Sequence, residues 1–218
     1  MFRKLFDPDN ALMITMSQIT DCIFLSLFWL IGCVPVVTVG TSFAALYDAT
    51  YRAYRKGEKH SWGRFFHVFR QNWKAGILPG LAVLAVFSGF LWGMIQIWNG
   101  AVAQKISFGV FAGCAFVSVV MLGVLSIVFP QLSRFEVSFG TLMKNSLLLG
   151  ILNLPKTVGL GVLNALTIFL CVRFVFPVFF LPALSALLGS LLIEPMFKPY
   201  MPKEAEETKE EIQGEAAE

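Results

Sequence analysis

The stretch WLIGCVPVVTVGTSFAALYDATYRAYRKGE, residues 29–58, begins apolar, breaks at Pro35 and ends in tyrosine and basic residues. Proline removes a backbone donor and clashes with the preceding helical turn. Gly40 follows, and Ser42 is a residue type that favours the first position of a helix. The stretch therefore predicts an apolar helix that ends between Pro35 and Gly40. It also predicts a second helix that begins at Ser42 and stops near Gly57.

The composition is typical of a membrane protein. Hydrophobic residues make up 56% of the 218 residues and charged residues 14%, whereas a soluble domain carries about 25% charged residues. Mean hydropathy is +0.71. The sequence predicts an all-α, polytopic transmembrane helix bundle that occupies residues 1–200. Five apolar runs are each about long enough to cross a hydrocarbon layer of roughly 30 Å: residues 20–39, 76–98, 106–129, 157–174 and 178–197.

The net charge of +3 is unevenly distributed. Residues 203–218 hold seven glutamates and two lysines, which is −5, so the rest of the chain carries +8. A polar, highly charged stretch cannot bury enough apolar surface to fold. We therefore interpret residues 201–218 as an acidic disordered cytoplasmic tail. The basic remainder suits the lipid bilayer as a partner, with its anionic surface, and the sequence holds no nucleic-acid-binding motif.

The positions of lysine and arginine predict the orientation in a plasma membrane. These residues concentrate in segments 40–74 and 131–156, and basic segments are retained on the cytoplasmic side. Both segments and the C-terminal tail are therefore expected inside the cell. An odd number of spans then leaves the N-terminus outside, although Arg3 and Lys4 lie there.

Segment 40–74 is predicted to form two amphipathic interfacial helices. The second, SWGRFFHVFRQNWK (residues 61–74), places aromatic residues on one face with basic residues beside it, which suits the cytoplasmic headgroup level. Two interpretations are open for this face: a connector packed under the bundle, or a docking surface for a partner. The candidate interaction face consists of Trp62, Phe65, Phe66, Phe69, Asn72 and Trp73.

Charged residues are scarce inside the predicted spans, where they are usually functional or paired. Asp21 and Arg173 lie near the outer ends of the first and fourth spans, so they form a candidate polar pair. The alternative is that each side chain reaches the interface separately. Glu194 lies near the inner end of the last span.

The sequence predicts no catalytic, metal or cofactor site. The four cysteines and two histidines lack ligand spacing. No hydrolase, metalloprotease or phosphate-binding motif occurs, so we expect neither enzymatic activity nor a cofactor. LIGC before Pro35 resembles a lipobox centred on Cys33. Because apolar residues follow that cysteine, we do not expect lipidation.

Two further patterns concern duplication and helix packing. FHVFRQN (residues 66–72) and FGTLMKN (residues 139–145) each precede a span. Both have a phenylalanine, a hydrophobic residue three positions later and an asparagine three positions after that. They suggest a duplicated span–loop–span unit, as occurs in transporters. Three glycine pairs have the spacing that lets helices approach closely, within the protein or across a dimer: Gly76/Gly80, Gly89/Gly93 and Gly109/Gly113.

A series of motifs covers nearly all of the chain before the acidic tail. An acidic residue opens the first span, and P-x-V-T-x-G, A-L-Y and F-F-x-x-F-x-x-N follow. With VFPQLSRF and LLIEPMFKPY further on, these motifs resemble the YesL family of bacterial integral membrane proteins, a family with no assigned activity. Cys33 and Val34 depart from its pattern, which usually has serine and leucine there. The matching positions are Asp21, Pro35, Val37, Thr38, Gly40, Ala45, Leu46, Tyr47, Phe65, Phe66, Phe69 and Asn72.

The resemblance implies a polytopic plasma-membrane protein. Members of that family often accompany carbohydrate-uptake genes, which implies an accessory role in sugar import and contact with a membrane transport complex. Two hypotheses follow. The first is a non-enzymatic accessory or scaffold protein. The second is a small-solute permease or channel, to which the repeat and the candidate pair Asp21 and Arg173 would belong.

Overall fold

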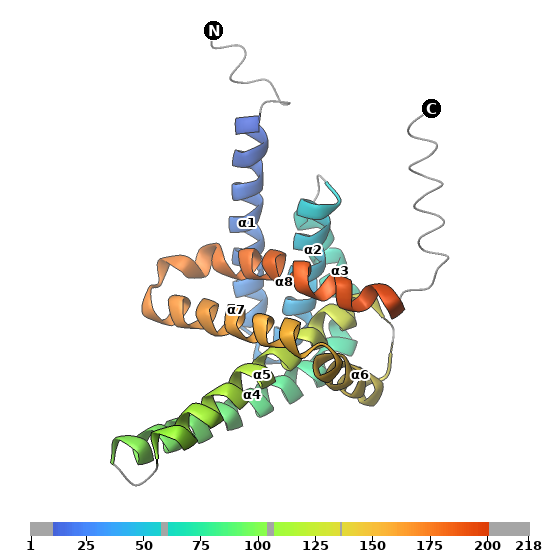
Figure 1. The fold of residues 1–218 in the computed structure, drawn as a ribbon. Coiled ribbons are helices and arrows are strands. Elements are labelled where there is room, and N and C mark those ends of the chain that lie inside the picture. The colour runs from blue at the N-terminus through green and yellow to red at the C-terminus, as the bar shows by residue number, and fades with distance from the viewer. Residues whose placement is uncertain (1–10, 58–60, 104–106, 136, 201–218) are drawn as a thin grey trace.

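The computed structural model describes residues 11–57, 61–103, 107–135 and 137–200. Within them the chain forms helices and no strand, which confirms the all-α fold class (Figure 1). The predicted acidic tail and its boundary at residue 201 lie outside the described residues. The elements are α1 (Ala11–Cys33), η2 (Val36–Thr38), α2 (Val39–Arg55), α3 (Ser61–Gln71), α4 (Trp73–Val102), α5 (Phe108–Arg134), α6 (Phe139–Leu152), α7 (Leu154–Arg173), η3 (Phe176–Phe179), α8 (Leu181–Phe197) and η4 (Lys198–Tyr200).

Four of these helices are long and apolar enough to cross a membrane, as in a multi-pass membrane protein. They correspond to the last four predicted spans, and α7 and α8 form a hairpin whose junction contains Pro177 and Pro182. The first predicted span, residues 20–39, falls on α1 and the turn that follows it, and α1 is not among these four helices. The four candidate spans are Trp73–Gly100, Phe108–Arg134, Leu154–Arg173 and Leu181–Tyr200.

The break at Pro35 turns the chain back on itself. α1 ends at Cys33, and Thr38 closes the turn because its Oγ1 donates to the carbonyl oxygens of Gly32 at 2.7 Å and Pro35 at 2.8 Å. The bond to Gly32 satisfies a carbonyl group in the last turn of the interrupted helix. α2 begins at Val39, earlier than the predicted Ser42, because η2 leads directly into it. The predicted stop is confirmed: Gly57 follows α2 with a φ of 67°.

α2 is the central helix of the described structure. The helix predicted at this position is present, but it packs inside the protein: the residues from Gly40 to Thr50 are buried, with Phe43 half-buried. α2 contacts α1, α3, α4, α5 and α8. Each of three buried apolar clusters includes α2 residues: Leu46 with α1 and α3, Tyr47 with α5 and α8, and Ala44 with α4 and α5. The polar side chains in its middle, such as Thr41, Ser42, Asp48 and Thr50, are buried among other helices, which hydropathy alone does not reveal.

Glycines bring pairs of helices into backbone contact. A Cβ atom on Gly40 would lie 2.4 Å from the carbonyl oxygen of Gly76, so the predicted Gly76/Gly80 packing face is confirmed, with α2 as its partner. α5 and α7 meet in the same way: a Cβ atom on Gly123 would lie 2.0 Å from the carbonyl oxygen of Thr157. In contrast, no atom lies within 4 Å of a Cβ atom added at Gly89 or Gly93.

The structure contains a repeated unit, in a register different from the predicted one. A short helix, an asparagine and two long helices occur twice: α3, Asn72, α4 and α5, then α6, Asn153, α7 and α8. Both asparagine Nδ2 atoms donate to the carbonyl oxygen four residues earlier, at 3.1 Å in Asn72 and 3.2 Å in Asn153. The counterpart of Asn72 is therefore Asn153, at the end of α6, and not Asn145.

The glycine contact between α5 and α7 gives the first prediction. We expect Gly123→Ala to destabilise the folded protein by roughly 1–3 kcal/mol, because the methyl group would force two backbones apart. Thermal unfolding in detergent micelles measures the effect. Gly113→Ala is the matched control on the same helix, since open space surrounds that position. Equal unfolding temperatures for the two variants would contradict the backbone contact.

Candidate functional site

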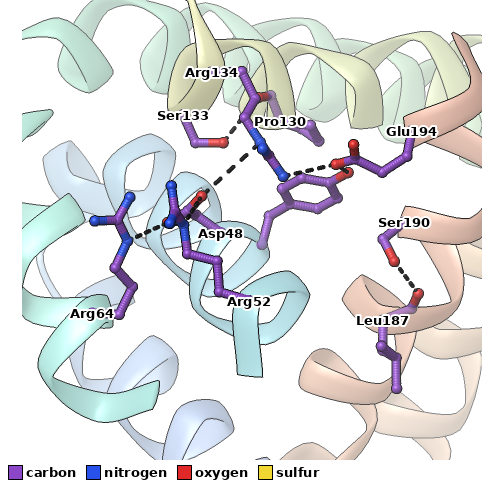
Figure 2. A network of polar contacts seen from close by, with 10 residues as sticks. Asp48, Arg52, Arg64, Pro130, Ser133, Arg134, Leu187, Ser190 and Glu194 are labelled. Atoms are coloured by element: carbon purple, nitrogen blue, oxygen red, sulfur yellow. Dashed lines mark hydrogen bonds and ion pairs between the residues drawn. The ribbon is translucent and has the colours of Figure 1, made fainter. Parts of the chain in front are cut away.

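A buried carboxylate lies where α2, α3 and α5 meet. The side chain of Asp48 on α2 is fully buried and is surrounded by arginines (Figure 2). Arg64 of α3 donates from Nε to Oδ2 at 2.7 Å, and Arg52, one turn further along α2, donates from Nε to Oδ1 at 3.3 Å. Arg134, at the end of α5, places its Nε 4.0 Å from Oδ1. Three helices thus supply counter-charges to one carboxylate.

Arg134 links this carboxylate to a second one on α8. Its Nη2 donates to Oε1 of Glu194 at 2.8 Å, and Tyr47 of α2 donates from its hydroxyl to the same oxygen at 3.0 Å. The guanidinium also lies over the ring of Tyr51, 4.3 Å from the ring centre, in a cation–π contact. We call Tyr47, Asp48, Arg52, Arg64, Arg134 and Glu194 the charge network.

The network carries three positive and two negative charges and is only partly open to solvent. The side chains of Arg52 and Arg64 are 26% and 27% exposed, and those of Arg134 and Glu194 are 14% exposed. Burying Asp48 is tolerable because each charge has a partner. Burial, followed by the negative charge of Glu194, raises the pKa of the Tyr47 phenol. This phenol therefore stays protonated and remains a hydrogen-bond donor.

Chemically, the network is suited to joining helices. Both carboxylates accept charged or phenolic donors, and each donor comes from a different helix or helical turn. Across the residues that the structure describes, no group of three or more histidine, cysteine, aspartate or glutamate side chains is placed to hold a metal ion.

The structure gives Asp21 and Arg173 separate neighbours. Asp21 accepts a hydrogen bond from Oγ of Ser61 at 2.9 Å, which ties α1 to the first residue of α3. The guanidinium of Arg173 lies 5.7 Å from the ring centre of Phe174. The ion pairs formed by described residues involve Asp48 and Glu194 and do not bring Asp21 and Arg173 together.

The candidate interaction face of α3 divides into a buried and an exposed part. Phe65 is buried and Phe69 is half-buried, because both pack in the cluster that α3 shares with α1 and α2. Asn72 is half-buried at the start of α4. Trp62, Phe66 and Trp73 remain 57%, 46% and 48% exposed. The face available to a partner is therefore narrower than predicted.

Four residues of the motifs that resemble the YesL family have structural roles here: Pro35, Thr38, Gly40 and Tyr47. Pro35 and Thr38 make the turn between α1 and α2, and Gly40 allows α4 to approach α2. Tyr47 belongs to the charge network. The motif thus forms and positions α2.

The sequence interpretation missed Asp48 and its three arginines. It assigned Arg52, Arg64 and Arg134 to two cytoplasmic segments without noting a common partner. A signal was present: Asp48 is the one acidic residue between Asp21 and Glu58, and an arginine follows it one helical turn later.

Comparison with known proteins gives one match. A family described as "Protein of unknown function, DUF624" matches residues 22–94, about a third of the chain. The matched segment runs from α1 into α4 and includes Asp48 and Arg64 but not Arg134 or Glu194. No curated protein and no solved structure matches the chain.

The charge network gives the second prediction. We expect Asp48→Asn to cost roughly 3 kcal/mol of folding stability, because three arginines lose a buried counter-charge. Thermal unfolding in detergent measures this loss. Asp21→Asn is the matched control, since its side-chain oxygen still accepts from Ser61. Adding Arg64→Met to Asp48→Asn should recover part of the loss, and additive losses would show that the two side chains are not coupled.

The third prediction concerns the hydroxyl of Tyr47. Tyr47→Phe removes the hydrogen bond to Glu194 and is expected to cost about 1.5–3 kcal/mol, the usual contribution of a bond to a charged group. Tyr51→Phe is the control, because the ring that Arg134 contacts is retained. Chemical denaturation in micelles measures both variants. Indistinguishable stabilities would contradict a role for the Tyr47 hydroxyl.

Proposed function

We propose that the chain is a non-enzymatic accessory or scaffold protein of the plasma membrane that contacts a transport complex. The observation that carries this proposal is that the charges of the network pair with one another, so they join α2, α3, α5 and α8. Such an arrangement makes a rigid support. The exposed aromatic residues of α3 then provide the surface that a partner protein can contact.

The chemistry of that surface supports contact with a protein at the membrane. Trp62, Phe66 and Trp73 are exposed beside the exposed basic residues Arg70 and Lys74. Tryptophan and arginine are enriched in the regions of protein interfaces that contribute most to binding. The YesL resemblance supplies the finer part of the proposal, namely that the complex takes up carbohydrate.

The sidedness of the network supports the proposed orientation. Arg52, Arg64 and Arg134 come from segments whose basic residues predict a cytoplasmic position, and they meet at one site. We therefore place the α2–α3 connection, the end of α5 and the C-terminal tail in the cytoplasm.

A small-solute permease is the second candidate, and the repeated unit of α3–α5 and α6–α8 favours it. Transport of polar solutes requires several inward-facing polar groups. One pocket of about 170 Å³ lies between α4 and α5 and is lined by apolar residues and Ser118. Another of about 190 Å³ includes Gln131 and Asn145 and lies beside the end of α8. Pockets of this size and lining support the accessory role more than a solute path.

The fourth prediction tests the accessory role in native membranes. A photo-crosslinking amino acid at Trp62 is expected to form an adduct with a subunit of a transport complex. The same amino acid at Leu91 of α4, which is 53% exposed against 57% for Trp62, is the matched control and should react with lipid. Identical adducts at both positions, or lipid adducts alone, would contradict the proposed contact.

A flux measurement separates the two candidates. Vesicles that contain only this chain should take up labelled sugars no faster than empty vesicles. Uptake that depends on the chain and disappears in Arg134→Met would favour the permease.

A further inference from the structure

A pocket of about 190 Å³ lies where the end of α5, the helix α6 and the end of α8 meet. Its lining is mostly apolar and includes Phe135 and Phe197, whose rings pack edge to face with their centres 5.8 Å apart. Two carboxamide side chains also line it, Gln131 of α5 and Asn145 of α6. None of the described residues that line this pocket is charged. The pocket is therefore suited to a neutral group with an apolar part.

The amide of Gln131 lacks a partner within the described structure. The residue is 2% exposed, and its buried Nε2 forms no hydrogen bond with a described group. A buried donor without an acceptor destabilises a folded protein, and such groups are rare in native structures. A ligand that places an acceptor oxygen in the pocket would satisfy this donor.

Asn145 differs from three other asparagines of the chain. Asn72, Asn153 and Asn164 each donate from Nδ2 to the carbonyl oxygen four residues earlier. Asn145 is half-buried and makes no such bond, so its amide remains available to the pocket that it lines. Amides from two helices thus offer hydrogen-bond donors to one space.

One wall of the pocket continues into a surface that faces lipid. The second half of α6 exposes the large apolar side chains of Leu147, Leu148, Ile151 and Leu152. An exposed apolar surface of this kind on a multi-pass membrane protein is a site of contact with the membrane. Leu148 belongs both to this surface and to the pocket lining. The pocket is therefore adjacent to the lipid layer.

The volume limits the occupant to one part of a longer molecule. Pockets that enclose a whole drug-sized ligand have volumes of roughly 300–1,000 Å³, and this one has about 190 Å³. A lipid ester group with the first carbons of its acyl chain meets all of these conditions. It is neutral, its carbonyl oxygen accepts from amide N–H groups, and its hydrocarbon suits apolar walls.

We propose that this pocket binds a glycerophospholipid of the bilayer. An ester carbonyl oxygen accepts hydrogen bonds from Gln131 and Asn145, and the acyl chain leaves the pocket past Leu148. Since the lining residues belong to α5, α6 and α8, the lipid joins these three helices next to the charge network.

Residues beside the pocket suit the rest of such a lipid. Lys144 precedes Asn145 and is exposed, so it carries a positive charge that attracts a lipid phosphate. Tyr200 lines the pocket and is 57% exposed, and tyrosine is enriched at the level of the headgroups. The site does not depend on the partner contact proposed for α3, so either proposal can fail without the other.

The fifth prediction compares two lipids that differ in their carbonyl groups. Dioleoyl phosphatidylglycerol and its dialkyl ether analogue are added separately to the purified full-length protein in detergent. We expect the ester lipid to bind roughly tenfold more tightly, because it alone can accept from the two amides. Native mass spectrometry of the protein–lipid complex measures both affinities. Equal affinities for the two lipids would overturn the inference.

Substitutions test which side chains recognise the ester. Gln131→Met retains the length of the side chain and removes the amide. We expect this variant to fold, because it removes a buried donor without a partner, and to bind both lipids equally. Gln96→Met is the matched control, since Gln96 is exposed on α4 outside the pocket, and it should keep the preference. A tenfold preference that persists in Gln131→Met and in Asn145→Leu would contradict the site.

A second measurement identifies the occupant in native membranes. A photo-crosslinking amino acid at Tyr200 is expected to form a lipid adduct whose yield falls in Gln131→Met. An adduct with another protein, or with residues 201–218 of the same chain, would indicate a peptide occupant and overturn the inference. A lipid adduct of unchanged yield would indicate general contact with the bilayer and would also contradict a specific site.

Discussion

The fold depends on the burial of one negative charge. Asp48 is fully buried on the central helix, and an isolated carboxylate in such a position would be strongly destabilising. Arg64 and Arg134 must therefore reach it from α3 and α5, which brings the ends of these helices to the middle of α2. Because Arg134 also binds Glu194, the same requirement fixes the end of α8. The carboxylate of Asp48 thus fixes how α3 and α5, and through Arg134 also α8, approach α2.

A second constraint comes from the absence of a hydrophobic driving force between helices in lipid. Helices in a membrane associate through close packing and hydrogen bonds instead. Here Gly40 and Gly80 bring α2 and α4 together, and Gly123 and Gly161 do the same for α5 and α7. The glycine contacts set the distances between helices, whereas the charge network sets which helix ends meet. Together they allow a mostly polar helix to lie at the centre of an apolar bundle.

The sequence predicted the parts of this structure that depend on properties of neighbouring residues. The four long spans, the break at Pro35 and the stop at Gly57 follow from apolar length and backbone chemistry, and all are present. The central position of α2 was not predictable in that way, because hydropathy treats Asp48 and Arg52 as separate polar residues and not as partners. The register of the repeat was missed for a related reason. Asn153 matches Asn72 because both lie between a short and a long helix, and the residues around Asn153 do not resemble those around Asn72.

The charge network also affects how basic residues can be used to predict the orientation of the chain in the membrane. Counting lysines and arginines treats each as an independent cytoplasmic signal. Arg64 and Arg134 are paired with buried carboxylates in the folded protein, so their charges are largely neutralised there. In the folded state, attraction to anionic headgroups falls instead to exposed residues such as Arg55, Arg70 and Lys74. The exposed basic residues, rather than all basic residues, therefore account for the attraction of the folded protein to an anionic membrane surface.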